Sequence, residues 1–215
     1  MEEKRIPARI LRILVEQVRE LMGGRTLRVL FAQAGLPRYD DDHLPPMDDS
    51  PSVTVAEYSR VLTAMRKIFG ERGARPLMLK GGKTAFEEIR QANPARYAVI
   101  GAALKVLPAP KRIHLALMRL LEEAQEFYGN EYRLTEEKDA FFVEILDCPY
   151  CTEERREFAA TGQLAYKKPI CLIPVGAYTA LVQWAAGRPH RVEEIACAAL
   201  GAPHCRVRID KKSGP

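Results

Sequence analysis

Long apolar runs are missing from this chain of 215 residues. No stretch approaches the roughly 18 apolar residues that a membrane-spanning helix needs, so we expect no membrane insertion. The N-terminal segment has neither an uninterrupted apolar core nor a small-residue cleavage site, and its glutamates argue against a transit peptide. The absence of these signals predicts a cytoplasmic protein.

The excess of positive over negative charge is also small. The 33 basic residues stand against 28 acidic ones, and the two kinds are mixed along the chain, which leaves a net charge of +5. Nucleic-acid-binding domains concentrate their basic residues on one surface. The sequence therefore predicts a mixed, solvated surface and no direct nucleic-acid binding.

Enzymatic signatures are scarce. No Gly-x-Gly-x-x-Gly fingerprint follows a strand pattern, no iron–sulfur cysteine run is present, and no Ser-His-Asp or paired-carboxylate site stands out, so we name no catalytic residue. A Gly-Gly-Lys-Thr run at 81–84 resembles the end of a phosphate-binding loop. That loop needs a glycine five positions before Gly82, where this chain has Leu77. We instead expect a turn before a helix that Thr84 caps.

The periodicity of apolar residues changes along the chain. Helical spacing dominates residues 1–128, with a helix over 8–22 and another from the N-cap Thr54 to Gly70. Residues 129–210 contain two strand pairs separated by a strong helix that ends at Gly187. This order predicts one α+β domain over 1–215, in which N-terminal helices pack on an antiparallel sheet of about four strands, with a long helix between two hairpins and a polar tail at 211–215.

Cysteine is absent from the first two thirds of the chain, and all five cysteines lie in the last third, at positions 148, 151, 171, 197 and 205. In a reducing compartment this clustering favours metal binding or burial over disulfides. Cys148 and Cys151 bracket a tight Cys-Pro-Tyr-Cys turn, and Cys197 and Cys205 flank a hairpin turn around Gly201. Each pair can present two thiolates to one zinc ion. A set of Cys148, Cys151, Cys197 and Cys205 is one hypothesis, and five inert buried thiols are the other.

The run from Lys168 to Ile209 resembles the C-terminal half of the 4-vinyl reductase domain. The residues that carry the resemblance are Pro169, Cys171, Gly176, Trp184, Gly187, Glu194, Cys197, Gly201 and Cys205. Upstream, "FAQAGLP" and the segment from Tyr58 to Phe86 are similar to the N-terminal half of bacterial hydrocarbon-binding proteins of this family. The resemblance covers most of the chain.

This resemblance implies a fold related to the ligand-binding modules of nitric-oxide sensors and vesicle-tethering subunits. By similarity to the ligand-sensing domain of aromatic-responsive regulators, it also implies a structural zinc ion held by Cys171, Glu194, Cys197 and Cys205. Cys148 and Cys151 are then left as a second metal or redox pair. Side chains alternate along a strand, so Glu194 and Cys197 reach one ion only if a bulge or the strand end lies between them.

The resemblance implies a sensor or carrier of a small hydrophobic or aromatic molecule, which forms a homodimer and passes its signal to a separate output protein. Candidate ligand contacts are His114, Phe142, Tyr178, Val182 and Trp184. One alternative is a reductase of a tetrapyrrole vinyl group, or its auxiliary protein, in bacteriochlorophyll synthesis. A dimeric scaffold similar to tethering proteins is the other.

Overall fold

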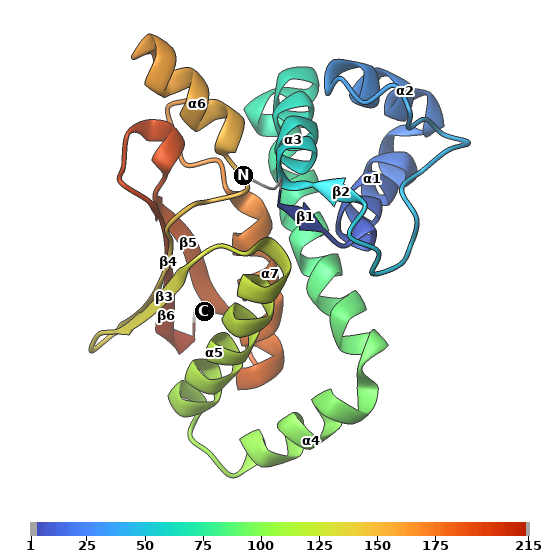
Figure 1. The fold of residues 1–215 in the computed structure, drawn as a ribbon. Coiled ribbons are helices and arrows are strands. Elements are labelled where there is room, and N and C mark those ends of the chain that lie inside the picture. Colours follow the sequence, from blue (N-terminus) through green and yellow to red (C-terminus); the bar gives the residue numbers. More distant parts are fainter. Residues whose placement is uncertain (1–3, 214–215) are drawn as a thin grey trace.

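The computed structural model describes residues 4–213, apart from the side chains of residues 103–105 and 127. Its N-terminal half is helical (Figure 1). Two short paired strands, β1 (Arg5–Ile6) and β2 (Val53–Thr54), hold the start of the chain beside the start of the longest helix. The helices are α1 (Ala8–Met22), α2 (Gly24–Gln33), α3 (Val55–Ala92), α4 (Pro94–Lys105) and α5 (Ala109–Tyr128).

Helix α3 begins where the sequence predicts. The Thr54 side chain accepts a hydrogen bond from the Glu57 backbone N–H, and the Glu57 carboxylate accepts one from the Thr54 N–H, which forms a capping box. Gly70, expected to end this helix, instead bends it: Gly70 has a φ of 65°, and the helix resumes and runs to Ala92.

The expected turn at the Gly-Gly-Lys-Thr run is wrong, because residues 81–84 lie inside α3. The glycines serve close packing against α7 (Leu172–Ala186). A Cβ at Gly82 would overlap the Ile173 carbonyl oxygen, and one at Gly176 would overlap the Leu79 carbonyl oxygen. The two helix backbones therefore touch where both lack side chains, and tertiary packing overrides the local preference of Gly-Gly for a turn.

The C-terminal half contains the predicted antiparallel sheet of four strands. These are β3 (Tyr132–Glu136), β4 (Ala140–Ile145), β5 (His190–Ala196) and β6 (Cys205–Ser213), in the order β3-β4-β6-β5. Helices α6 (Thr152–Thr161) and α7 lie between the two hairpins in sequence. The α+β prediction is confirmed. The predicted tail boundary is wrong, because β6 continues through Ser213; Gly214 and Pro215 lie outside the described residues.

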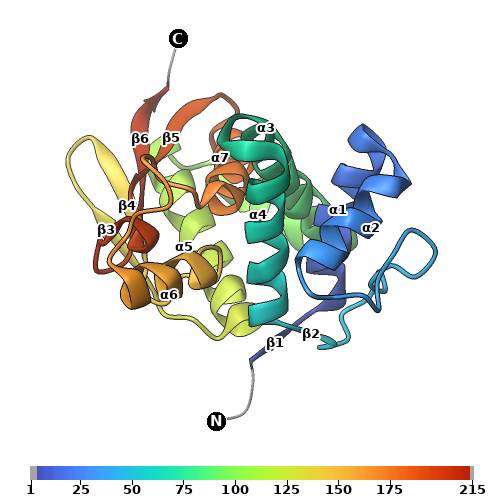
Figure 2. The ribbon, with the colours of Figure 1, turned by 90° about the horizontal axis from the view of Figure 1, so that it is seen from above.

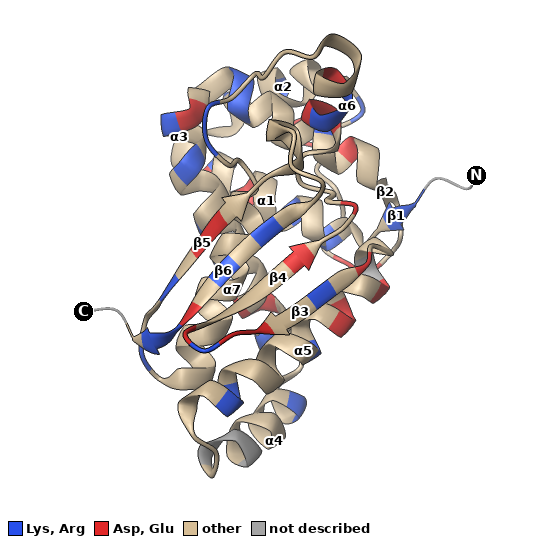
Figure 3. Cartoon of the chain, turned by 90° about the vertical axis from the view of Figure 1, so that its left-hand side faces the viewer, with Lys and Arg blue, Asp and Glu red and all other residues tan. Residues whose placement is uncertain are grey.

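Helix α7 is the centre of the molecule. One side of α7 packs with α5 against the sheet, and the other side packs against α3, beyond which α1 and α2 lie (Figures 1 and 2). In Figure 3 the sheet faces the viewer and these helices lie behind it. Phe141 and Val143 point inward and are fully buried. The alternation of β4 turns Phe142 to the outer face, where the Arg206 guanidinium lies 4.1 Å from its ring centroid.

No helix within the described part of the chain is both long enough and apolar enough to cross a membrane.

Candidate metal centre and adjoining cleft

All five cysteines converge on one buried point between α6, α7 and the β5–β6 hairpin. Each is at most 1% exposed, and none forms a disulfide. Cys171 Sγ lies 3.5 Å from the Sγ of Cys148, 3.9 Å from that of Cys197 and 3.7 Å from that of Cys205. Cys205 Sγ lies 3.5 Å from that of Cys151 and 4.0 Å from that of Cys197. The thiols thus form one cluster. We use the name thiol cluster for the five cysteines together with Glu194.

Two sets of four residues within the cluster have all their ligand atoms within 4.8 Å of one another. One is the set that the family resemblance implies, Cys171, Glu194, Cys197 and Cys205. The other joins Cys148 and Cys151 to Cys171 and Cys205. The rival set of the sequence analysis, which pairs Cys148 and Cys151 with Cys197 and Cys205, is neither of these two.

The expected irregularity between Glu194 and Cys197 is present. The register of β5 against β6 shifts between Glu194 and Ala196, and the strand ends at Ala196. The extra residue, Ile195, is exposed. This bulge and the strand end bring the Glu194 carboxylate and the Cys197 thiol to the same side.

Local backbone structure places the remaining ligands of this set. Cys171 immediately precedes α7, and its backbone N–H donates to Glu194 Oε2 over 2.7 Å. The other carboxylate oxygen, Oε1, is buried and has no hydrogen-bond partner among the described residues. After Cys197 a single 3₁₀ turn, Ala198–Leu200, reverses the chain through Gly201, whose φ is 84°. The Ala198 N–H then donates to Cys205 Sγ.

A buried ion pair that the sequence analysis missed supports the Cys-Pro-Tyr-Cys turn. Arg66 on α3 is 4% exposed, and its guanidinium donates to Glu154 Oε1 over 2.9 Å and to the Tyr150 carbonyl oxygen over 3.0 Å. Tyr150 lies between Cys148 and Cys151, and Glu154 lies in the first turn of α6. No local sequence pattern signals this pairing, because its partners are 88 residues apart in sequence.

Burial and thiol–thiol hydrogen bonds shift the pKa values of the cluster upward for Cys148, Cys171, Cys205 and Glu194, and downward for Cys151. Burial raises the pKa of the Cys148 thiol to about 11 and that of Cys171 well above its usual value. Hydrogen bonds from Cys148 and the other thiols lower the pKa of Cys151. Burial also raises the pKa of Glu194 to about 7. Without a metal, most groups of the cluster therefore favour their protonated forms. A bound cation would stabilise their deprotonated, anionic forms.

The donor set and its spacing fit a zinc ion. A tetrahedral zinc ion with sulfur ligands at about 2.3 Å places neighbouring sulfur atoms about 3.8 Å apart. The five sulfur–sulfur distances given above range from 3.5 to 4.0 Å. The free Glu194 Oε1 is available as an oxygen ligand, since nothing among the described residues occupies it.

A cleft of about 860 Å³ adjoins the cluster. Glu194 is part of its wall, and so are Ile170 and Leu172, which flank Cys171. The buried part of its lining is mainly apolar and includes Ala74, Met78, Ile170, Leu172 and Val175. Its rim carries the exposed cations Arg72, Arg75, Lys167 and Lys168, which form no ion pair with any residue that the structure describes. The rim also contains the exposed Glu71 and the ion pair of Arg191 with Glu193, so cations outnumber carboxylates there. The cleft therefore offers an apolar surface below a basic rim.

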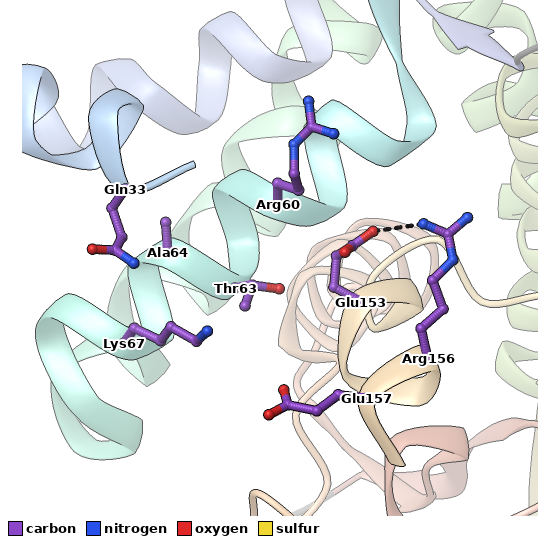
Figure 4. A pocket seen from close by; sticks show the side chains of 8 residues that line it. All are labelled: Gln33, Arg60, Thr63, Ala64, Lys67, Glu153, Arg156 and Glu157. Carbon is purple, nitrogen blue, oxygen red and sulfur yellow. Dashed lines mark hydrogen bonds and ion pairs between the residues drawn. The ribbon is translucent and has the colours of Figure 1, made fainter. Parts of the chain in front are cut away.

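A second cavity, of about 320 Å³, lies between α3 and α6 (Figure 4). Its lining is mostly polar: Gln33, Arg60, Thr63, Lys67, Glu153, Arg156 and Glu157, with Ala64 as the one apolar residue. Glu153 and Arg156 pair across 2.9 Å on one side of it. This cavity is smaller and offers little apolar surface to a hydrophobic molecule.

The five predicted ligand contacts do not meet in one cavity. Phe142 lies on the outer face of the sheet, and His114 Nδ1 lies 3.2 Å from the Glu136 carboxylate. Tyr178 and Val182 are buried in the core, and Trp184 packs against Phe86 and Tyr97. None of the five lines either cavity described above.

Solved structures share the fold of this chain. An Fe(II) unliganded H-NOX protein mutant from K. algicida matches with a TM-score of 0.61 and 11% identity over 97% of this chain and 98% of that one. An H-NOX protein from S. oneidensis in the Fe(II)NO ligation state gives 0.58 and 11% identity over 98% and 100%. The phenol-responsive sensory domain of the transcription activator PoxR gives 0.47 and 15% identity over 74% of each chain, a likeness too distant to carry an argument.

At these identities the likeness shows the fold alone. It confirms the expected relation to the fold of nitric-oxide sensors. No protein-family model matches the chain, and no curated protein matches it at a significant level. Membership in the 4-vinyl reductase family therefore stays a prediction.

The four histidines of the chain do not fit the role of axial ligand to a haem, the group named for one H-NOX structure. An axial histidine needs a ring nitrogen that faces an apolar cavity. Here His43 contacts Asp40, His114 contacts Glu136, and His204 contacts Glu144. The Nδ1 atom of His190 lies 2.8 Å from the Asp210 carbonyl oxygen. None of the four lines either cavity.

Proposed function

We propose that the chain is a small-molecule sensor or carrier in which a structural zinc ion shapes the binding cleft. The observation that carries this proposal is the convergence of Cys171, Glu194, Cys197 and Cys205 within 4.8 Å, at the wall of the larger cleft. A zinc ion bound to these four residues would have a closed shell and would supply structural bonds rather than catalysis.

The protein residues transmit the effect of these bonds to the cleft. Cys171 joins two cleft residues, Ile170 and Leu172, and Glu194 is itself in the wall. Fixing the thiol of Cys171 and the carboxylate of Glu194 therefore fixes the start of α7 and the bulge of β5 relative to each other. We infer that the cleft keeps its shape only while the cluster is closed.

The lining of the cleft supports one class of ligand. Apolar side chains form the buried part, and the unpaired cations Arg72, Arg75, Lys167 and Lys168 surround the opening. A volume of about 860 Å³ is sufficient for a drug-sized molecule. The ligand is therefore an organic molecule with an apolar or aromatic body and an anionic group.

Two fluorescent probes test this assignment. Anilinonaphthalene sulfonate has an aromatic body and a negative charge, and N-phenyl-1-naphthylamine has the same body without the charge. We expect the sulfonate to bind once per chain and about ten times more tightly than the neutral probe, a difference of about 1.4 kcal/mol. The double variant Arg72→Gln/Arg75→Gln should remove this preference.

The matched control is Arg25→Gln/Arg28→Gln, which removes two exposed cations from α2, far from the cleft lining in sequence and absent from it. This control should leave both affinities unchanged. Equal binding of the two probes, or equal effects of the two double variants, would contradict the proposed ligand class. NADPH-dependent loss of a divinyl tetrapyrrole would instead support the reductase alternative, and stable dimers that bind neither probe would support the scaffold.

A further inference from the structure

The two four-residue sets in the thiol cluster overlap in a specific way. They share Cys171 and Cys205, and each has two members of its own: Cys148 and Cys151 in one, Glu194 and Cys197 in the other. We propose that the cluster holds two metal ions rather than one, with the thiolates of Cys171 and Cys205 bridging them. This inference rests on the proposed metal site and adds a second ion to it.

The distances support a bridged pair. The shared sulfurs of Cys171 and Cys205 lie 3.7 Å apart. On one side Cys148 lies 3.5 Å from Cys171, and Cys151 lies 3.5 Å from Cys205. On the other side Cys197 lies 3.9 and 4.0 Å from the same two sulfurs. Each distance is close to the sulfur–sulfur edge of about 3.8 Å in a tetrahedral zinc site.

A single ion does not use all six ligands. Neither set with mutual spacing under 4.8 Å combines Cys148 or Cys151 with Glu194 or Cys197. The two pairs therefore belong to different four-ligand sets, which share the edge between the sulfurs of Cys171 and Cys205. One ion in either set leaves the other pair without a metal, whereas two ions give every ligand a partner and each ion four ligands.

Charge does not oppose the second ion. Five thiolates and a carboxylate around two divalent ions leave two negative charges, and four such ligands around one ion leave the same two. Helix α6 begins at Thr152, directly after Cys151, so the positive end of its dipole adjoins the Cys148–Cys151 side. The Arg66 guanidinium holds the carbonyl oxygen of Tyr150 in the same turn.

Native mass spectrometry of the full chain, purified without added metal or chelator, tests the count of ions. We expect two zinc ions per chain. The double variants Cys148→Ser/Cys151→Ser and Glu194→Gln/Cys197→Ser should each retain one ion. Each variant removes the two ligands that bind only one of the two ions. Tyr150→Phe, in the same turn but without a ligand atom, should retain two.

The outcomes separate the two proposals. If the unaltered chain binds one ion and Cys148→Ser/Cys151→Ser retains that ion in full, the proposal of a second ion is overturned and the proposed function stays intact. A chain without any metal would overturn both. Acid-labile sulfide with visible absorption would overturn both as well, because it would identify an iron–sulfur cluster.

Cadmium substitution provides a test that needs no variant. The unaltered chain loaded with ¹¹³Cd should give two NMR signals, one for a site with four sulfur ligands and one for a site with three sulfurs and an oxygen. Coupling between the two signals is expected, since two sulfurs connect the ions. A single signal at saturating cadmium would contradict the bridged pair.

Discussion

The two ends of the molecule are held together by different chemistry. Helices α1, α2 and the first part of α3 meet through fully buried apolar side chains, among them Leu11, Leu27, Leu30, Phe31 and Leu62. The segments that join α6, α7 and the β5–β6 hairpin meet instead on five thiols and one carboxylate. Burial of apolar surface stabilises the first region. By the proposal above, the second region would depend on the metal ions that its ligands bind. Metal loss is therefore expected to destabilise the second region and leave the first region largely unchanged.

The largest effect is expected from a shared ligand. Cys205→Ser should destabilise the metal-bound protein by at least about 4 kcal/mol, because loss of a metal is among the few single changes that cost this much. Hydrogen exchange should increase at 148–173 and 190–210 and change little at 8–33. As a control, chelator-treated wild type should match the variant, and uniform exchange over the whole chain would contradict the division into two regions.

The ion pair between α3 and α6 links the two regions. Arg66→Met leaves the Glu154 carboxylate, which is 3% exposed, without its charged partner and with only the Thr63 hydroxyl as a donor, and should cost about 3–5 kcal/mol in chemical denaturation. Arg66→Met/Glu154→Leu should recover most of this loss, because it removes the unpaired charge as well. A double variant no more stable than the single one would show that packing, rather than charge, sets the cost.

The metal-free protein should lose stability as pH rises. The pKa of Glu194 is raised from 4.5 to about 7 by burial, so the folded chain binds this proton more tightly than the unfolded chain does. Its contribution is present below about pH 4.5 and is lost between about pH 4.5 and 7, and it amounts to about 3 kcal/mol. Denaturation of chelated protein over this range should show the fall, and Glu194→Gln should lack it. An equal fall in both would assign it to other groups.

The smallest effect is expected at the crossing of α3 and α7, which lies outside both the apolar core of α1, α2 and α3 and the thiol cluster. Gly82→Ala places a Cβ against the Ile173 backbone and should cost about 2 kcal/mol. Gly81→Ala meets only the ends of the Leu14 and Ile173 side chains, at 3.1 and 3.5 Å, and should cost less than about 1 kcal/mol. Thermal unfolding of both variants measures the difference, and equal costs would show that the backbone approach is not limiting.

Local patterns predicted the fold class well. The change from helical spacing to strand pairs, the Thr54 cap and the Gly187 stop depend on neighbouring residues, and all are present. The Gly-Gly-Lys-Thr run was misread because its environment comes from α7, which lies about 90 residues further along the chain. The spacing of residues in the sequence does not predict that contact. A helical conformation at Gly81 and Gly82 was therefore not predictable from neighbouring residues.

The candidate site was predictable in part. The alternation of side chains along β5 required a bulge near Glu194, and the bulge is there. The approach of Cys148 and Cys151 to the other thiols was not predictable, because the long-range pair of Arg66 and Glu154 helps to position their turn. One of the predicted ligand contacts failed for a local reason: Phe142 was expected to face a ligand inside the domain, although strand alternation turns it outward.

X-ray absorption at the zinc edge, on protein purified without added metal, tests the account most directly. A metal held by this cluster should show mainly sulfur neighbours at about 2.3 Å and a minor contribution from oxygen near 2.0 Å. A coordination shell made only of nitrogen and oxygen, or a protein that retains no zinc, would contradict the central claim that these cysteines and Glu194 hold a metal at the wall of the cleft.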